Sequence, residues 1–299
     1  MTHAAALVAV HAAVALFGFA GLFGKWLTLS PVAIVLGRTT VAALALGILL
    51  LRARTRAPFD VRLIANGVVL ALHWLSFFAA IQESTVAVGL LGFASFPLFT
   101  LLAERVFLAR RLRRRDGVTV LLVTAGLALL VPELSLANPV VLGLGWGLVS
   151  GFTFALLVVM NRRWTGTRTA TDIAFWQNAL AALVLVPFAW AADYAIGPIG
   201  GREIMLIIVL GLACTALAHT LFISGLAVVT AHTASVIAAL EPVYGIALAL
   251  VFLGEVPTPR TIAGGALIVA AAVIATRRSH LATVAARDPT RDPTREAHL

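Results

Sequence analysis

The chain has 299 residues, of which 61% are hydrophobic and only 12% are charged, against a charged share of about 25% in ordinary soluble domains. This composition excludes a soluble globular protein. The single cysteine, Cys214, excludes a disulfide framework and a thiolate metal site. The net charge of +9 must be interpreted by position before any partner is inferred from it.

Apolar runs of about twenty residues, the length that an α-helix needs to cross a hydrocarbon layer about 30 Å thick, recur along the chain. They predict an all-α, polytopic membrane protein with ten transmembrane helices. The predicted spans are 4–24, 31–51, 62–81, 85–107, 117–132, 140–161, 170–191, 203–225, 232–253 and 260–276. The first is expected to be a retained helix, because no lysine or arginine precedes it as in a signal peptide.

The ten spans form two sets of five. We predict a first five-helix repeat over residues 1–135, a second over 136–278 and a disordered cytoplasmic tail over 279–299. The tail contains Asp-Pro-Thr-Arg twice and has no apolar period, so it cannot bury enough surface to order itself. Contact of its arginines with lipid headgroups is an alternative interpretation.

Basic residues gather on alternate sides of the predicted spans. If the N-terminus is cytoplasmic, the inner segments hold 18 of the 22 lysines and arginines, while the outer segments hold only Lys25, Arg202 and Arg260. Short cytoplasmic loops carry the excess of basic residues in membrane proteins. We therefore expect a multi-pass protein of a bacterial-type inner (plasma) membrane with both termini cytoplasmic.

An internal repeat relates the two sets. The segment LLGFASFPLF at 90–99 corresponds to SVIAALEPVY at 235–244, 145 residues later, and the offset holds without insertion across roughly forty residues. Because five is an odd number, the two sets enter the membrane from opposite sides, which is the plan of secondary transporters. Pro97 and Pro242 occupy equivalent positions, weaken their helices and are predicted hinges.

Ionisable residues inside the spans are few, and a charge in hydrocarbon is costly enough to suggest a function. Glu241 before Pro242 forms a polar notch, which contacts a substrate amine or coupling ion, or else pairs with a neighbouring helix. His73 is expected to face a cavity, because an imidazole facing lipid would be unsatisfied. Arg38 either snorkels outward or binds a carboxylate. Asp172 lies within reach of arginines near a cytoplasmic end and is interpreted as structural.

The sequence shows no clear pattern of another functional class of membrane protein. The histidines are on separate helices without metal-ligand spacing, so no metal and no cofactor are predicted. Gly147 to Gly151 has the wrong spacing for a serine nucleophile turn, and no pair of central aspartates indicates an aspartyl protease. A selectivity filter or ring of charge is also missing. The chain is therefore not expected to be an enzyme or a channel.

Two blocks, 75–107 and 221–255, with LEPV at 240–243 and FLGEVP at 252–257, resemble the paired EamA-type repeats of the drug/metabolite transporter superfamily. ALHWLSFF at 71–78 and SFPLF at 95–99 look most similar to its amino-acid and metabolite exporters, including the YddG-type exporters of aromatic amino acids. The resemblance implies a ten-helix carrier with a central cavity lined by helices 1, 3, 4, 6, 8 and 9. The sequence departs from the family pattern in one respect: the pair Gly254-Glu255 in the second half corresponds to Ala109-Arg110 in the first half.

We expect a secondary exporter of amino acids, with aromatic or hydrophobic ones preferred, or of similar small metabolites, working by alternating access. Its expected partners are this substrate and the lipid bilayer, without nucleic acid, and one chain suffices for a pathway. The candidate substrate contacts are Trp74, Phe78, Phe96 and Trp146 for an apolar side chain, and His73, Ser76, His219, Ser224 and Glu241 for the polar head. The alternatives are a cationic drug exporter and a lipid-linked sugar flippase.

Overall fold

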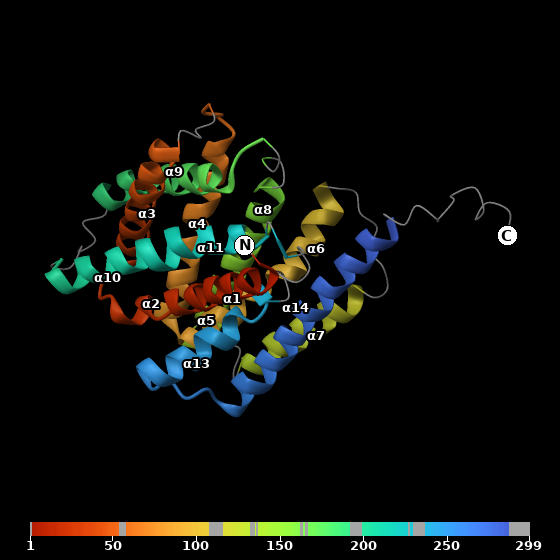
Figure 1. The fold of residues 1–299 in the computed structure, drawn as a ribbon. Helices are drawn as coiled ribbons and strands as arrows, with labels where there is room; N and C mark the ends of the chain where they lie inside the picture. The colour runs from red at the N-terminus through yellow and green to blue at the C-terminus, as the bar shows by residue number, and fades with distance from the viewer. Residues whose placement is uncertain are drawn as a thin grey trace.

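A computed structural model describes residues 2–53, 58–107, 116–131, 135, 137–161, 164, 167–191, 199–226, 228–229 and 237–286. Within these ranges the elements are helices (Figure 1). The first half contains α1 (His3–Ala20), α2 (Phe23–Trp26), α3 (Pro31–Ala53), α4 (Leu63–Glu83), α5 (Val86–Phe93), α6 (Phe96–Phe107) and α7 (Asp116–Leu130). The second half contains α8 (Pro139–Asn161), α9 (Ala170–Ala191), α10 (Gly201–Gly211), the π-helix η1 (Leu212–Leu217), α11 (Ala218–Leu226), α13 (Glu241–Leu253) and α14 (Pro259–Ala286).

Polar residues in the loops fix where several helices begin and end. The Thr2 hydroxyl accepts a hydrogen bond from the N–H of Ala5 at the start of α1, and the Thr85 hydroxyl does the same for Val88 at the start of α5. These oxygens satisfy donors that have no partner inside the helix. α13 ends at Gly254, whose φ of 68° lies in the left-handed region that glycine adopts without strain.

The apolar runs of the sequence coincide with these helices. In the described part of the chain, six helical stretches are long and apolar enough to cross a membrane: His3–Trp26, Pro31–Ala53, Leu63–Glu83, Pro139–Leu157, Thr171–Trp190 and Gly201–Phe222. Four shorter apolar helices, Val86–Thr100, Asp116–Leu130, Glu241–Leu253 and Pro259–Ile274, lie at the other predicted spans. The predicted class, an all-α polytopic membrane protein, is confirmed. Ten spanning segments and the two repeat boundaries remain predictions.

The C-terminal helix is longer than its apolar span. α14 continues to Ala286 and so enters the segment 279–299, which was expected to be a tail. Its sequence there, SHLATVAA, contains good helix formers and no proline before residue 289. The remainder, 287–299, lies outside the described residues.

The two halves of the chain interleave. α4 of the first half packs against α8 and α9 of the second, and α1 packs against α11 and α13. Figure 1 shows α7 and α14 side by side along their lengths at one edge of the molecule. The largest buried apolar cluster draws on both halves, from Phe23 and Phe77 to Leu185 and Ala249. A relative movement of the halves therefore has to pass through these shared interfaces.

Pairs of glycines let helices of the two halves approach closely. The pairs are Gly18 and Gly245, Gly92 and Gly147, and Gly126 and Gly264. A Cβ atom added at Gly18 would lie only 2.8 Å from the backbone nitrogen of Gly245. Small residues of this kind are enriched where membrane helices pack, because they allow close backbone contact.

Candidate substrate-binding site

Two helices that correspond under the 145-residue repeat are broken at the same place. α5 ends at Phe93 and α6 begins at Phe96, while in the second half a turn at 239–240 precedes Glu241, the first residue of α13. Pro97 and Pro242 are thus the second residues of their helices, where a missing N–H costs no intrahelical hydrogen bond. The breaks occur at the prolines that the sequence indicated. Movement about them as hinges remains a prediction.

His73 on α4 lies in a buried cluster of rings next to the break between α5 and α6. The centre of its imidazole is 4.6 Å from the ring centre of Trp74 and 5.6 Å from that of Phe93. Phe96 stacks on Phe93 at 5.5 Å, and Phe154 of α8 lies 5.3 Å from His73. We call these five residues the ring cluster. It offers flat apolar surfaces with an imidazole among them.

A hydrogen bond to α8 fixes the orientation of the imidazole. His73 is 2% exposed, and its Nδ1 lies 3.0 Å from both the carbonyl oxygen and the hydroxyl oxygen of Ser150. Because a carbonyl oxygen only accepts hydrogen bonds, the contact with it requires a proton on Nδ1. The neighbouring Ser76 hydroxyl donates within α4 to the carbonyl oxygens of Leu72 and His73. Its proton is therefore used inside its own helix.

Arg38 of α3 is fully buried beside the ring cluster. Its Nε and Nη2 donate to the Thr215 hydroxyl oxygen at 3.1 and 2.8 Å. Its guanidinium carbon lies 3.7 Å from the ring centre of Trp74 and 5.5 Å from that of Phe78. These distances indicate a cation–π contact with Trp74. Arg38 therefore does not snorkel to the membrane surface, which was one of its two predicted roles.

The other predicted polar residues surround this centre less closely. His219 of α11 lies 5.5 Å from the ring of Phe17 on α1. Glu241 is half-buried and lies within electrostatic range of Arg38, but the two side chains form no ion pair within 4.0 Å. The carboxylate therefore does not neutralise the guanidinium by direct contact.

Two predicted contact residues lie away from the ring cluster. Trp146 of α8 is 45% exposed, and Ser224 of α11 is also exposed, whereas every member of the cluster is buried or half-buried. α8 is apolar along most of its length, so its sequence does not show which face is turned inward. The structure therefore brings His73, Trp74, Phe78 and Phe96 together but leaves these two side chains outside the group.

Sequence reasoning passed over several residues of this site. Phe93 lies inside the repeated segment and was visible as part of it, but Phe154 and Ser150 carry no local signal. Thr215 belongs to the site only because it contacts Arg38, which lies 177 positions away in the sequence. No group of three or more potential metal ligands occurs among the described residues.

The sequence is similar to known membrane transporters. The model of the EamA-like transporter family matches residues 4–131 and 141–277, once in each half. The chain is 28% identical over 259 residues to the pseudopaline exporter CntI of Pseudomonas aeruginosa (strain UCBPP-PA14), covering 84% of this chain and 87% of that one. It is also 28% identical over 204 residues to the uncharacterized transporter YwfM of Bacillus subtilis (strain 168), covering 67% and 68% of the two chains.

A solved crystal structure shares the fold. It superposes with a TM-score of 0.63 at 20% sequence identity and covers 93% of this chain and 99% of its own. At this identity the similarity concerns the arrangement of helices alone.

Proposed function

The chain belongs to the EamA-like transporter family, and on this basis we propose that it exports amino acids, with aromatic or hydrophobic ones preferred, or similar small metabolites. The observation that carries this proposal is the ring cluster, where His73 lies among Trp74, Phe93 and Phe154 at the break of α5. Flat apolar faces with few, well-placed polar groups are typical of small-molecule sites. Such a surface suits an aromatic side chain.

The broken helices support movement by alternating access. In transporters with inverted repeats, substrate sites form where membrane helices are interrupted, and one half rocks against the other around the site. Here the interruptions before Phe96 and Glu241 fall at equivalent positions of the repeat. The glycine contacts between halves, such as Gly18 with Gly245, provide close-packed surfaces about which rocking takes place.

The relatives support export of a small metabolite. One of them is named for the export of pseudopaline, and we extend to this chain the direction of transport rather than that substrate. The distribution of lysine and arginine supports cytoplasmic termini, and with an inner membrane location the substrate would enter from the cytoplasm. Site contacts are assigned to His73, Trp74, Phe78 and Phe96, with Glu241 and His219 at the polar side.

Counterflow in proteoliposomes tests the proposal. Vesicles containing the purified protein and loaded with unlabelled phenylalanine are expected to accumulate labelled phenylalanine. Phe154→Ala should slow this uptake, because it removes a ring 5.3 Å from His73. The matched control is Phe152→Ala on the same helix, whose side chain is 47% exposed and contacts Phe99 instead.

The outcome discriminates among substrate classes. Equal uptake by wild type, Phe154→Ala and Phe152→Ala would show that the ring cluster does not contact the substrate. If a panel of amino acids gives no counterflow and no thermal stabilisation, while organic cations or lipid-linked sugars stabilise the protein, the amino-acid proposal is wrong.

A further inference from the structure

Arg38 carries a buried nitrogen that lacks a hydrogen-bond partner. The side chain has 0% exposure, and its Nε and Nη2 are both bonded to Thr215. Across the residues that the structure describes, no acceptor lies within reach of Nη1. Leaving a buried donor unsatisfied costs roughly 1–3 kcal/mol and more when the group is charged. An acceptor supplied by a ligand would remove this cost.

The free part of the guanidinium has a defined shape. A guanidinium carries five N–H groups in a planar fork. The bonds from Nε and Nη2 to one oxygen use the edge that these two nitrogens share. The edge formed by Nη1 and Nη2 therefore remains available. Carboxylates bind such an edge with two parallel hydrogen bonds.

Two contacts hold this edge in a fixed position. The Trp74 ring lies 3.7 Å from the guanidinium carbon, and the Thr215 hydroxyl donates to the carbonyl oxygen of Leu210 at 3.0 Å. The second bond spans five residues, which is the spacing of the π-helix Leu212–Leu217. π-Turns inside α-helices are frequent at functional sites. A donor that is already positioned loses little entropy when its ligand binds.

The local charge favours an anion. No aspartate or glutamate within the described ranges forms an ion pair with Arg38. Glu241 lies within electrostatic range but does not contact it. The indole N–H of Trp74, which also lacks an acceptor within those ranges, is a second donor beside the guanidinium. An anion is therefore the ligand that would complete this arrangement.

We propose that the Nη1–Nη2 edge of Arg38 binds the carboxylate of the transported substrate. The inference rests on the proposed function and narrows it, because it requires a carboxylate on the substrate and disfavours simple amines. Trp74 links the two parts of the site: its ring lies under Arg38 and 4.6 Å from the imidazole of His73. A substrate whose carboxylate is on Arg38 thus has its side chain directed to the ring cluster.

Binding of three related ligands tests the assignment. Phenylalanine, 3-phenylpropionate and phenylalaninamide are compared by calorimetry on the purified full-length protein, as wild type and as Arg38→Gln. The wild type should bind both carboxylates more tightly than the amide. Arg38→Gln should bind the two carboxylates ten- to a hundredfold more weakly, roughly the range of one hydrogen bond to a charged group, with little change for the amide.

Control variants separate binding from folding. Thr215→Val keeps Arg38 but removes its anchor, so it should weaken carboxylate binding in the same sense as Arg38→Gln and by a smaller factor. Thr220→Val changes a threonine of α11, which directly follows η1. The Thr220 hydroxyl donates to the backbone carbonyl oxygen of Ala216, four residues earlier, so this variant should leave binding unchanged. Gel filtration and thermal unfolding establish that each variant is folded.

The results also distinguish the two proposals. If Arg38→Gln keeps the preference for carboxylates, the subsite is wrong while amino-acid export stands. If wild type binds 3-phenylpropionate in an Arg38-dependent way but neither binds nor transports any amino acid, the subsite stands and the amino-acid proposal is wrong. If wild type binds no carboxylate, the inference is overturned.

Discussion

Glu255, which follows α13 in the second half, accepts a hydrogen bond at 3.0 Å from the backbone N–H of Val86, the first residue of α5 in the first half. At the same end of the bundle, the Lys25 ammonium donates to the carbonyl oxygen of Ser84 at 2.5 Å. A carboxylate at a helix N-terminus satisfies a free N–H and interacts favourably with the helix dipole. The bond between Glu255 and Val86 ties the two halves together on the side predicted to face outward, while the bond between Lys25 and Ser84 lies within the first half.

Glu255→Ala should therefore destabilise the protein. The Thr85 cap of α5 stays, but the variant loses the acceptor of the Val86 N–H at the start of this helix. Such an acceptor is worth about 1 kcal/mol, so the thermal unfolding midpoint in detergent should fall. Glu83→Ala, which removes an exposed carboxylate at the end of α4, is the matched control and should shift the midpoint much less. Equal midpoints for the two variants would contradict a stabilising role for the contact.

Gly18→Ala should destabilise the contact between α1 and α13. The new Cβ would lie 2.8 Å from the nitrogen of Gly245 and 3.0 Å from the carbonyl oxygen of Glu241, and both are backbone atoms that cannot turn away. Overpacking of this kind costs about 1–3 kcal/mol. Gly145→Ala is the control, because nothing lies within 4 Å of its Cβ. It should leave stability unchanged or raise it by less than about 1 kcal/mol. A lower midpoint for Gly145→Ala than for Gly18→Ala would reverse the expectation.

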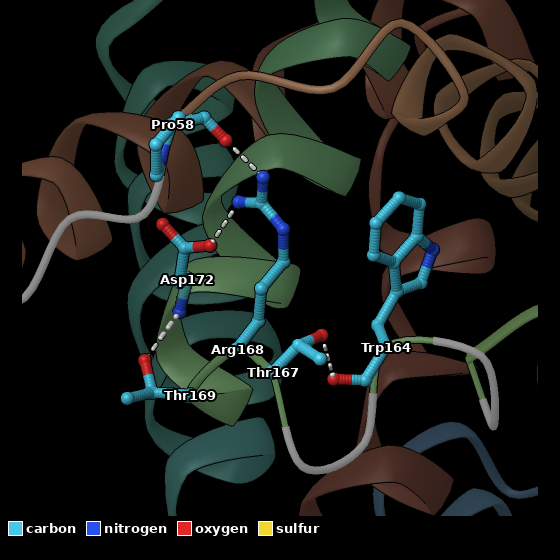
Figure 2. Close-up of polar contacts among 6 residues, drawn as sticks. All are labelled: Pro58, Trp164, Thr167, Arg168, Thr169 and Asp172. Carbon is cyan, nitrogen blue, oxygen red and sulfur yellow. Dashed lines mark hydrogen bonds and ion pairs between the residues drawn. The ribbon is translucent and has the colours of Figure 1, made fainter.

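Asp172→Asn should be among the more destabilising single changes. Arg168 Nη1 lies 2.5 Å from Asp172 Oδ2, and the two side chains are only 6% and 1% exposed. Arg168 also donates to the Pro58 carbonyl oxygen in the first half, while the Thr169 hydroxyl accepts from the N–H of Asp172 (Figure 2). Breaking a buried pair leaves a charge unpaired and costs about 3–5 kcal/mol. This pairing agrees with the structural role expected for Asp172.

The control for this prediction is an ion pair whose arginine is exposed. Arg202 and Glu203 are 3.2 Å apart, and the Arg202 side chain is 56% exposed. Glu203→Gln should therefore change stability by less than about 1 kcal/mol. Denaturant or thermal unfolding of both variants measures the difference, and an effect of Asp172→Asn no larger than that of Glu203→Gln would contradict it.

Thr215→Val should lower both stability and phenylalanine counterflow. The change removes the oxygen that accepts from Arg38 Nε and Nη2. A buried charged group that loses its acceptors costs about 1–3 kcal/mol. Thr215→Ser restores the hydroxyl and should recover most of the loss in uptake. A valine variant with wild-type uptake and midpoint would show that Thr215 does not position Arg38.

The sequence by itself determined the helices and their breaks. Apolar runs long enough for a bilayer fixed the fold class, and the repeat at an offset of 145 placed Pro97 and Pro242 at equivalent breaks. Both signals are local or periodic, so they can be recognised without knowledge of the tertiary structure. The buried Asp172 was also placed beside an arginine for a local reason, since Arg168 is four residues away.

Only the tertiary structure decided which side chains meet. In helices that are apolar all round, the pattern does not distinguish a residue facing lipid from one facing the centre, so Trp146 and Phe154 of α8 could not be separated by sequence. The contact of Arg38 with Thr215 joins residues 177 positions apart and depends on a π-turn that has no sequence signature. The sequence left two possible roles for Arg38. The packing of the two interleaved halves, rather than any motif, shows that it is a buried donor beside the ring cluster.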